Sequence, residues 1–111
     1  MKDLYPPKVK KAVDALLTSP AVSTPKLRQG IEAYAARLWG GSREVPDIPG
    51  DLVDYVRKVA LYAYKTTDED IQRLKEAGYS EDVIFEITLC ASMGASLARL
   101  ERGLTVLKGK R

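Results

Sequence analysis

Residues 87–98, ITLCASMGASLA, contain no charged side chain, although Glu86 and Arg99 bracket them in a chain of 111 residues that is 30% charged. A helix that is apolar on every side has to be buried on every side. The preceding residues, 66–86, TTDEDIQRLKEAGYSEDVIFE, predict a short helix, a glycine stop and a new helix start. We therefore expect the fold to be arranged around a buried helix near the end of the chain.

Five segments have apolar residues at helical spacing, and none alternates with a period of two. The helices are expected over residues 6–18, 25–39, 51–65, 68–77 and 81–107. Thr24 followed by Pro25, Thr67 with Asp70, and Ser80 are start signals, and Gly78 is a stop signal. Residues 42–50, SREVPDIPG, form the joint between the first two helices and the rest, but about 40 residues make a poor separate core. The sequence predicts one all-α domain over residues 1–111.

The last helix has two different apolar stripes. One is bulky and the other is small enough for a second backbone to approach closely. The bulky stripe is Phe85, Leu89, Met93, Leu97, Leu100, Leu104 and Leu107, and the small stripe is Ala91, Gly94, Ala95 and Ala98. A chain of this length has few helices with which to surround such a helix, so we expect a homo-oligomer with the last helix at or beside the interface.

Composition excludes several kinds of chemistry. The chain has no histidine and one cysteine, so Ser-His-Asp triads, Cys-His dyads and the usual zinc sites are excluded, and no metal or cofactor is expected.

The absence of a disulfide favours the cytoplasm. No apolar run is expected to reach the length of a membrane span. A net charge of +3 without interleaved aromatic residues does not favour nucleic-acid binding.

Residues 51–107 resemble the core of the alkylhydroperoxidase D / carboxymuconolactone decarboxylase family. The most specific part runs from Ala77-Gly78 to Phe85-Glu86, where S-E-D-x-I-F-E leads into an Ala-rich helix. The resemblance implies an all-helical alkylhydroperoxidase D-like fold, with residues 50–107 as the family-like core and residues 1–49 as an N-terminal helical extension. It also implies a homo-oligomer, often a trimer or a hexamer built from dimers.

The resemblance does not carry over the family's peroxidase centre. Its Cys-x-x-Cys pair falls on Ala63 and Thr66, its histidine on Asp70 and its glutamate on Asp51, so only an acid is retained. Reduction of a peroxide by a dithiol needs two thiols. The lactone decarboxylase branch would need a proton-shuttling histidine, which the chain lacks.

Four residues are candidates for a residual pocket: Tyr62, Thr66, Asp70 and Asp51. Tyr62 and Thr66 share a helix face if the third helix continues through Lys65, and Asp70 begins the next helix. Each has a structural alternative. Asp70 fits a helix-capping acid, Asp51 fits an acid of a first helical turn, and the residues near Tyr62 fit an ordinary helix end.

Three other residues have mainly structural interpretations. Trp39 is expected to anchor the core or an interface, and Cys90 to be an inert buried thiol. Glu86 could pair with Arg57 or Arg99, or face water.

Two functions of different class fit these residues. The first is a family-like protein, without the dithiol centre, that binds or transforms a small polar molecule in the pocket. The alternative is a non-catalytic helical oligomerisation or interaction module. A pocket that gathers several of the four candidates favours the first, and their burial without a cavity favours the second.

Overall fold

Five α-helices make up the described part of the chain. The computed structural model describes residues 7–40 and 47–108. The elements are α1 (Pro7–Thr18), α2 (Pro25–Leu38), α3 (Gly50–Tyr62), a 3₁₀ turn η1 (Ala63–Lys65), α4 (Asp68–Glu76) and α5 (Glu81–Lys108). Neither described range contains a strand, so the all-α prediction is confirmed and its boundaries hold to within three residues. Residue 6 and residues 42–46 of the predicted joint lie outside the described residues.

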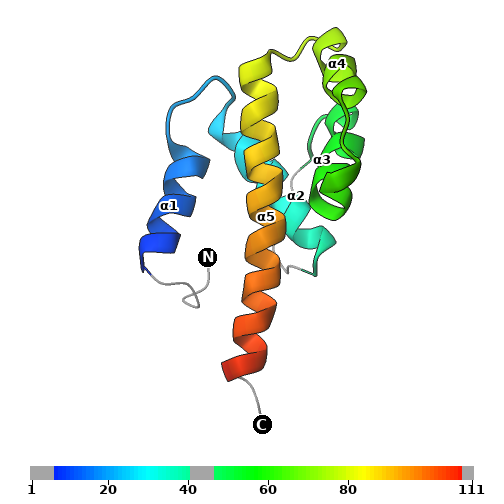
Figure 1. Cartoon of the computed structure of the whole chain (residues 1–111). Coiled ribbons are helices and arrows are strands. Elements are labelled where there is room, and N and C mark those ends of the chain that lie inside the picture. The colour runs from blue at the N-terminus through cyan, green and yellow to red at the C-terminus, as the bar shows by residue number, and fades with distance from the viewer. Residues whose placement is uncertain (1–6, 41–46, 109–111) are drawn as a thin grey trace.

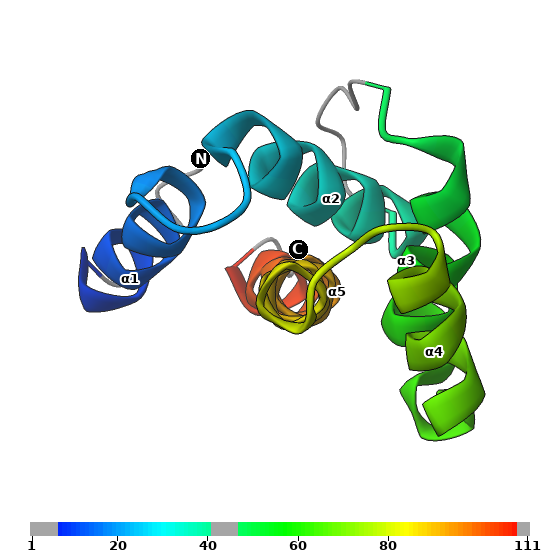
Figure 2. The ribbon, with the colours of Figure 1, turned by 90° about the horizontal axis from the view of Figure 1, so that it is seen from above.

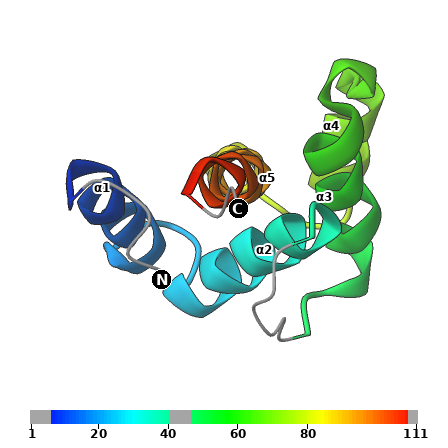
Figure 3. The ribbon, with the colours of Figure 1, turned by 90° about the horizontal axis from the view of Figure 1, so that it is seen from below.

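Helix α5 stands at the centre of the molecule. Figure 1 shows α1 on one side of it, the α3–α4 pair on the other and α2 passing behind. Figures 2 and 3, which look along α5 from its two ends, show the same three neighbours. No described element covers the fourth side, which faces the viewer in Figure 1. The helix that the sequence places at the centre is therefore surrounded on three sides by its own chain.

The small-residue face of α5 packs against the backbone of α2. Ala91, Gly94, Ala95 and Ala98 are all buried. A Cβ added at Gly94 would lie 3.0 Å from the carbonyl carbon of Glu32 and 3.1 Å from the Cβ of Ala35, and closer still to the Glu32 oxygen. A side chain of any size is thus excluded there, and the predicted close approach of a second backbone is confirmed.

The opposite face of α5 is open, which corrects the expectation that the uncharged run is buried on every side. Ser92 and Ser96 within the run are exposed, and so is Leu89. Of the bulky stripe only Leu97 is buried, Met93 and Leu104 are half-buried, and the other four are exposed: Phe85 (63%), Leu89 (40%), Leu100 (42%) and Leu107 (76%). No element within residues 7–40 and 47–108 covers them.

Helix α5 also corrects the expectation that no segment matches a membrane span. It holds an 18-residue window of mean hydropathy 1.5, which is long and apolar enough to cross a membrane by length and composition. However, 44% of that window is buried against the rest of the chain. Central helices of soluble folds have the same composition, because they too are apolar on most sides.

The predicted start and stop signals lie at the observed helix ends. Thr24 Oγ1 accepts from the Leu27 N–H at 3.1 Å, and Ser80 Oγ accepts from the Val83 N–H at 3.2 Å. After α4, Gly78 adopts a φ of +107°, and the Tyr79 N–H donates to the Leu74 carbonyl at 3.1 Å. Only glycine adopts this left-handed conformation without strain, so Gly78 turns the chain from α4 towards α5.

Candidate functional site

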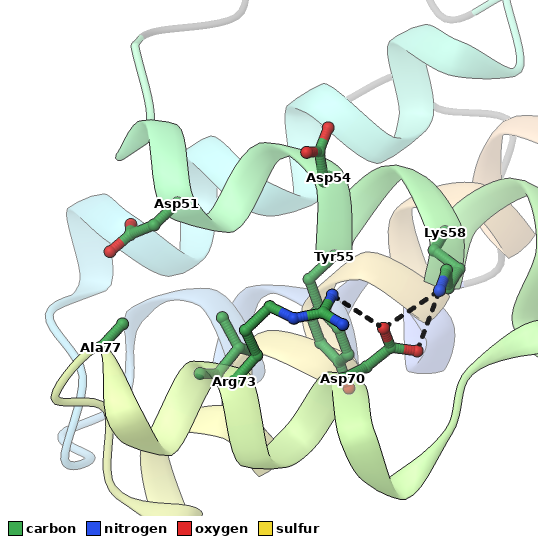
Figure 4. A pocket seen from close by; sticks show the side chains of 8 residues that line it. Asp51, Asp54, Tyr55, Lys58, Asp70, Arg73 and Ala77 are labelled. Atoms are coloured by element: carbon green, nitrogen blue, oxygen red, sulfur yellow. Dashed lines mark hydrogen bonds and ion pairs between the residues drawn. The ribbon is translucent and has the colours of Figure 1, made fainter.

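A groove of about 310 Å³ runs between α3 and α4. Each helix contributes four residues at i, i+3, i+4 and i+7, which is one helical face. The lining residues are Asp51, Asp54, Tyr55 and Lys58 from α3, and Asp70, Arg73, Leu74 and Ala77 from α4. Tyr55 and Leu74 are buried, so the groove has an apolar floor and charged sides. Figure 4 shows these side chains from close by.

Asp70 is the centre of the charged cluster at one end of the groove. The Lys58 ammonium lies 3.0 Å from both carboxylate oxygens, and Arg73 Nη1 lies 3.7 Å from one of them (Figure 4). The Thr67 N–H donates to the same carboxylate at 2.9 Å, and the Thr67 hydroxyl accepts from the Asp70 N–H at 3.3 Å. This reciprocal pair is a capping box, so the interpretation of Asp70 as a helix-capping acid is confirmed.

These contacts determine the charge state of Asp70. The hydrogen bond from Lys58 lowers the pKa of its carboxyl, burial opposes this, and the hydrogen bonds from Thr67 lower it further. Asp70 is therefore ionised at neutral pH. General acid–base catalysis there favours a group that titrates near neutrality, so Asp70 is better suited to holding structure than to moving protons.

The other end of the groove carries two carboxylates. Asp51 lies in the first turn of α3 and accepts a hydrogen bond from the Tyr79 hydroxyl at 2.7 Å. Burial, together with this bond to Asp51, raises the pKa of Tyr79 to about 12. Asp54 is exposed, and its carboxylate points away from the Asp70 cluster (Figure 4). Lys58 and Arg73 thus pair with Asp70, whereas Asp51 and Asp54 lie outside that cluster.

The structure places two of the four sequence candidates in this groove and two outside it. Asp51 and Asp70 line it, whereas Tyr62 and Thr66 do not. Tyr62 and Thr66 do not share a helix face, because α3 does not continue through Lys65. It ends at Tyr62, whose φ of −141° and ψ of 52° are not helical. Tyr62 is 45% exposed, with the Lys65 ammonium 5.1 Å from its ring centre, and the Thr66 hydroxyl donates to the Ala63 carbonyl at 2.8 Å.

Sequence reasoning missed Asp54, Lys58 and Arg73. All three lie on the groove-facing sides of α3 and α4, which are joined by a short connection and therefore lie side by side. A signal was available in the spacing: acids and bases recur at i, i+3 and i+7 on α3 and at i and i+3 on α4. Matching the two charge patterns across the connection would have found the cluster.

A second polar cluster ties the segment before α2 to α5, and it corrects the expectation for Glu86. Glu86 pairs with neither Arg57 nor Arg99. Its carboxylate accepts from the N–H groups of Val22 (3.1 Å) and Ser23 (2.8 Å) and from the Ser23 hydroxyl. Burial alone would raise the pKa of Glu86, but these hydrogen bonds outweigh it and the pKa is lowered.

Arg28 extends this cluster towards α1. Its guanidinium is buried and donates to the carbonyls of Leu16 and Ser19 at the end of α1. The arrangement joins α1 to α2 with a charged group whose two terminal nitrogens are occupied by backbone oxygens. Arg28 therefore has a structural role, because both terminal nitrogens already donate to backbone carbonyls.

Cys90 and Trp39 behave as the sequence predicts. Cys90 is fully buried, and burial raises the pKa of its thiol to about 11, so the thiolate needed for reaction is scarce at neutral pH. Trp39 packs against the core, its Nε1–H donates to the Ala60 carbonyl at 2.8 Å, and the Arg99 guanidinium lies 4.5 Å from its ring centre. Among residues 7–40 and 47–108, no group of three acidic or cysteine side chains is placed to hold a metal ion.

Comparisons with known proteins give no relative from which to assign a role to these residues. No protein-family description matches the sequence, no curated protein matches it, and no solved structure matches the fold.

Proposed function

We propose that the chain is a non-catalytic helical module that associates with copies of itself through the open face of α5. The observation that supports this is the exposure of Phe85, Leu89, Leu100 and Leu107 along one side of the central helix. Large apolar side chains exposed along one side of a central helix are typical of protein interfaces.

The end of α5 adds to this argument. No residue from Arg99 to Lys108 is fully buried, although these ten residues remain helical. Most helices are stabilised by tertiary packing rather than by propensity, so a projecting helix end needs a partner. Ser92, Ser96 and Gly103 interrupt the open face, and such small residues suit close packing against a helix better than insertion into lipid.

Family and location are part of the same proposal. The resemblance of residues 51–107 to the alkylhydroperoxidase D family supports self-association, with a trimer or a hexamer of dimers as possible end states. It does not support dithiol chemistry in a chain whose one cysteine is Cys90. A cytoplasmic location fits a chain without disulfides.

The test is the mass of the full chain in solution. Light scattering at micromolar concentration is expected to give a multiple of 12.3 kDa. Leu89→Lys places a charge on the open face and is expected to yield the monomer. Thr105→Lys is the matched control, because Thr105 is also exposed on α5 but lies on the opposite side of the helix from this face.

Two results would overturn this proposal. One is a mass near 12.3 kDa for the unmodified chain. The other is a monomer that binds vesicles of phosphatidylcholine and phosphatidylserine through the same Leu89-sensitive face.

A second candidate function is supported by the charge distribution of the groove between α3 and α4. The groove holds Lys58 and Arg73 beside Asp70, and two further carboxylates, Asp51 and Asp54, over an apolar floor. Small-molecule sites combine apolar surface with a few placed polar groups. This arrangement suits a short zwitterion, with its carboxylate near Arg73 and its ammonium near Asp54.

The groove can be tested without disturbing the rest of the fold. A series of linear ω-amino acids, titrated while amide chemical shifts are followed, is expected to perturb residues of α3 and α4. Arg73→Gln and Asp54→Asn should each abolish the response, because both side chains are exposed and their loss leaves the capping box in place. Tyr62→Phe is the control, since Tyr62 lies outside the groove.

A further inference from the structure

Exposed residues of α5 form a stripe whose spacing along the helix is the same from either end. This outer stripe consists of Phe85, Leu89, Ser92, Ser96, Leu100, Gly103 and Leu107, all of them exposed. Successive members are 4, 3, 4, 4, 3 and 4 residues apart. Over its length an α-helix makes about six turns and drifts by only about 40°, so the stripe stays on one face. Its midpoint is Ser96.

We propose that two copies of the chain pair antiparallel through this outer stripe, with a two-fold axis at Ser96. The inference rests on the self-association proposed above and adds its direction and register. A two-fold interface is isologous, so each stripe position meets its mirror position in the second copy. Phe85 then faces the partner's Leu107, Leu89 the partner's Gly103, Ser92 the partner's Leu100, and Ser96 the partner's Ser96.

Side-chain size supports this register. Leu89 meets a glycine, and Leu100 meets a serine, so large residues face small ones along the middle of the stripe. A shallow apolar hollow beside Gly103, lined also by Leu100 and Leu107, provides space for an incoming leucine. A parallel pairing in register would instead put leucine on leucine and glycine on glycine. That arrangement leaves gaps where the small residues meet, which close packing does not tolerate.

Charge supports the direction. The charged residues in the first half of α5 are acids, Glu81, Asp82 and Glu86. The second half contains Arg99, Arg102 and Lys108, with Glu101 as its one acid. An antiparallel pair lays the acidic half of one helix beside the basic half of the other, and it also opposes their dipoles. A parallel pair places like charges together.

Two serine-to-cysteine variants distinguish the directions. In the antiparallel pair the two copies of residue 96 face each other, whereas the two copies of residue 92 are offset by about 12 Å along the helix axis. A disulfide needs Cα atoms within about 7 Å. Ser96→Cys is therefore expected to form a disulfide-linked dimer on mild oxidation, and Ser92→Cys is not. Cys90 is fully buried, so the unmodified chain is a control that should stay unlinked.

A mixing experiment tests the register itself. Ser92→Cys and Leu100→Cys should each remain unlinked alone and should form a disulfide-linked heterodimer when mixed, as read by non-reducing electrophoresis and mass spectrometry. Disulfide dimers of Ser92→Cys alone would indicate parallel helices and overturn the inference. A dimeric mass without any of these links would also overturn it, while leaving self-association intact. A monomeric mass would instead overturn the proposed function.

Discussion

The contact between α2 and α5 and the contact between α3 and α4 hold helices together in different ways. Where α5 meets α2, Gly94 lets the two backbones touch, and the buried residues beside it are alanines. Where α4 meets α3, the Asp70 carboxylate binds Lys58 and caps its own helix, and a groove remains open. The first contact depends on the absence of side-chain atoms, and the second on a few polar atoms.

This difference determines where each contact tolerates change. A contact made by close-packed backbones fails when one methyl group is added, because neither backbone can move aside cheaply. A contact made by polar side chains loses only the interactions that are removed, and water can enter the groove in their place. We therefore expect substitutions in the α2–α5 contact to lower the free energy of unfolding strongly. Substitutions in the α3–α4 contact should lower it less.

The largest effect is expected from Gly94→Ala. The new methyl group collides with the backbone of Glu32, so the free energy of unfolding should fall by about 3 kcal/mol. Urea denaturation at fixed protein concentration measures this loss. Gly50→Ala is the control, because a Cβ there meets nothing within 4 Å, and its effect should stay within about 0.5 kcal/mol. Equal losses for both variants would contradict the assigned role of the close contact.

A smaller loss, about 1–2 kcal/mol at pH 7, is expected from Asp70→Asn, which weakens the capping box and the pairing with Lys58. The pKa of Asp70 is lowered in the folded state, so its stabilisation is complete above its ordinary value of 3.8 and is lost as the pH falls through the folded pKa. The difference between Asp70→Asn and the unmodified chain should therefore shrink below about pH 4. A difference that stays the same from pH 7 to pH 3 would contradict this role of Asp70.

Tyr79→Phe should cost about 1 kcal/mol or less, since it removes one hydrogen bond to Asp51. The pKa of Tyr79 is raised from 10.0 to about 12, so the unmodified chain should lose stability as the pH rises through this interval. Thermal unfolding between pH 9 and 12 measures the effect, which Tyr79→Phe should lack. Tyr64→Phe is the control, because Tyr64 is highly exposed. An unchanged alkaline profile in Tyr79→Phe would refute the role of this bond.

The smallest effect concerns Cys90, which lies within the close-packed core. With its pKa raised to about 11 and its side chain buried, the thiol should not react with peroxide in the folded chain. Peroxide consumption with a dithiol reductant is expected to stay at the background level in both the unmodified chain and Cys90→Ser. Turnover that disappears in Cys90→Ser would show a catalytic thiol after all.

The two contacts also differ in how well the sequence predicts them. Thr67 with Asp70 is a signal four residues long, and the capping box that it predicts is present. Gly94 indicates that some backbone comes close, but not that the backbone is that of Glu32, because the two are 62 positions apart in the chain. The sequence also does not indicate that Glu86 binds Ser23. The two residues are far apart in the chain, and Ser23 carries no charge that would mark it as a partner.

The candidate site shows a third kind of limit. Asp51 and Asp70, which became candidates through the family resemblance, line the groove, but the position of Tyr62 depends on where α3 stops. A change of helix type over three residues rotates every side chain that follows. The register of Thr66 relative to Tyr62 could therefore not be derived from counting residues alone.

The central position of α5 has a consequence for how the chain is made. Helix α5 follows α2, α3 and α4 in the chain, so these helices are synthesised before the helix against which they pack. At about 5–20 residues per second, adding the 28 residues of α5 takes roughly 1–6 s. During that interval the buried residues of α2 and α3, including Ile31, Leu52 and Val56, lack the part of the core that α5 supplies. The nascent chain should therefore depend on chaperones until α5 has been added, and truncations within α5 should aggregate rather than fold in part.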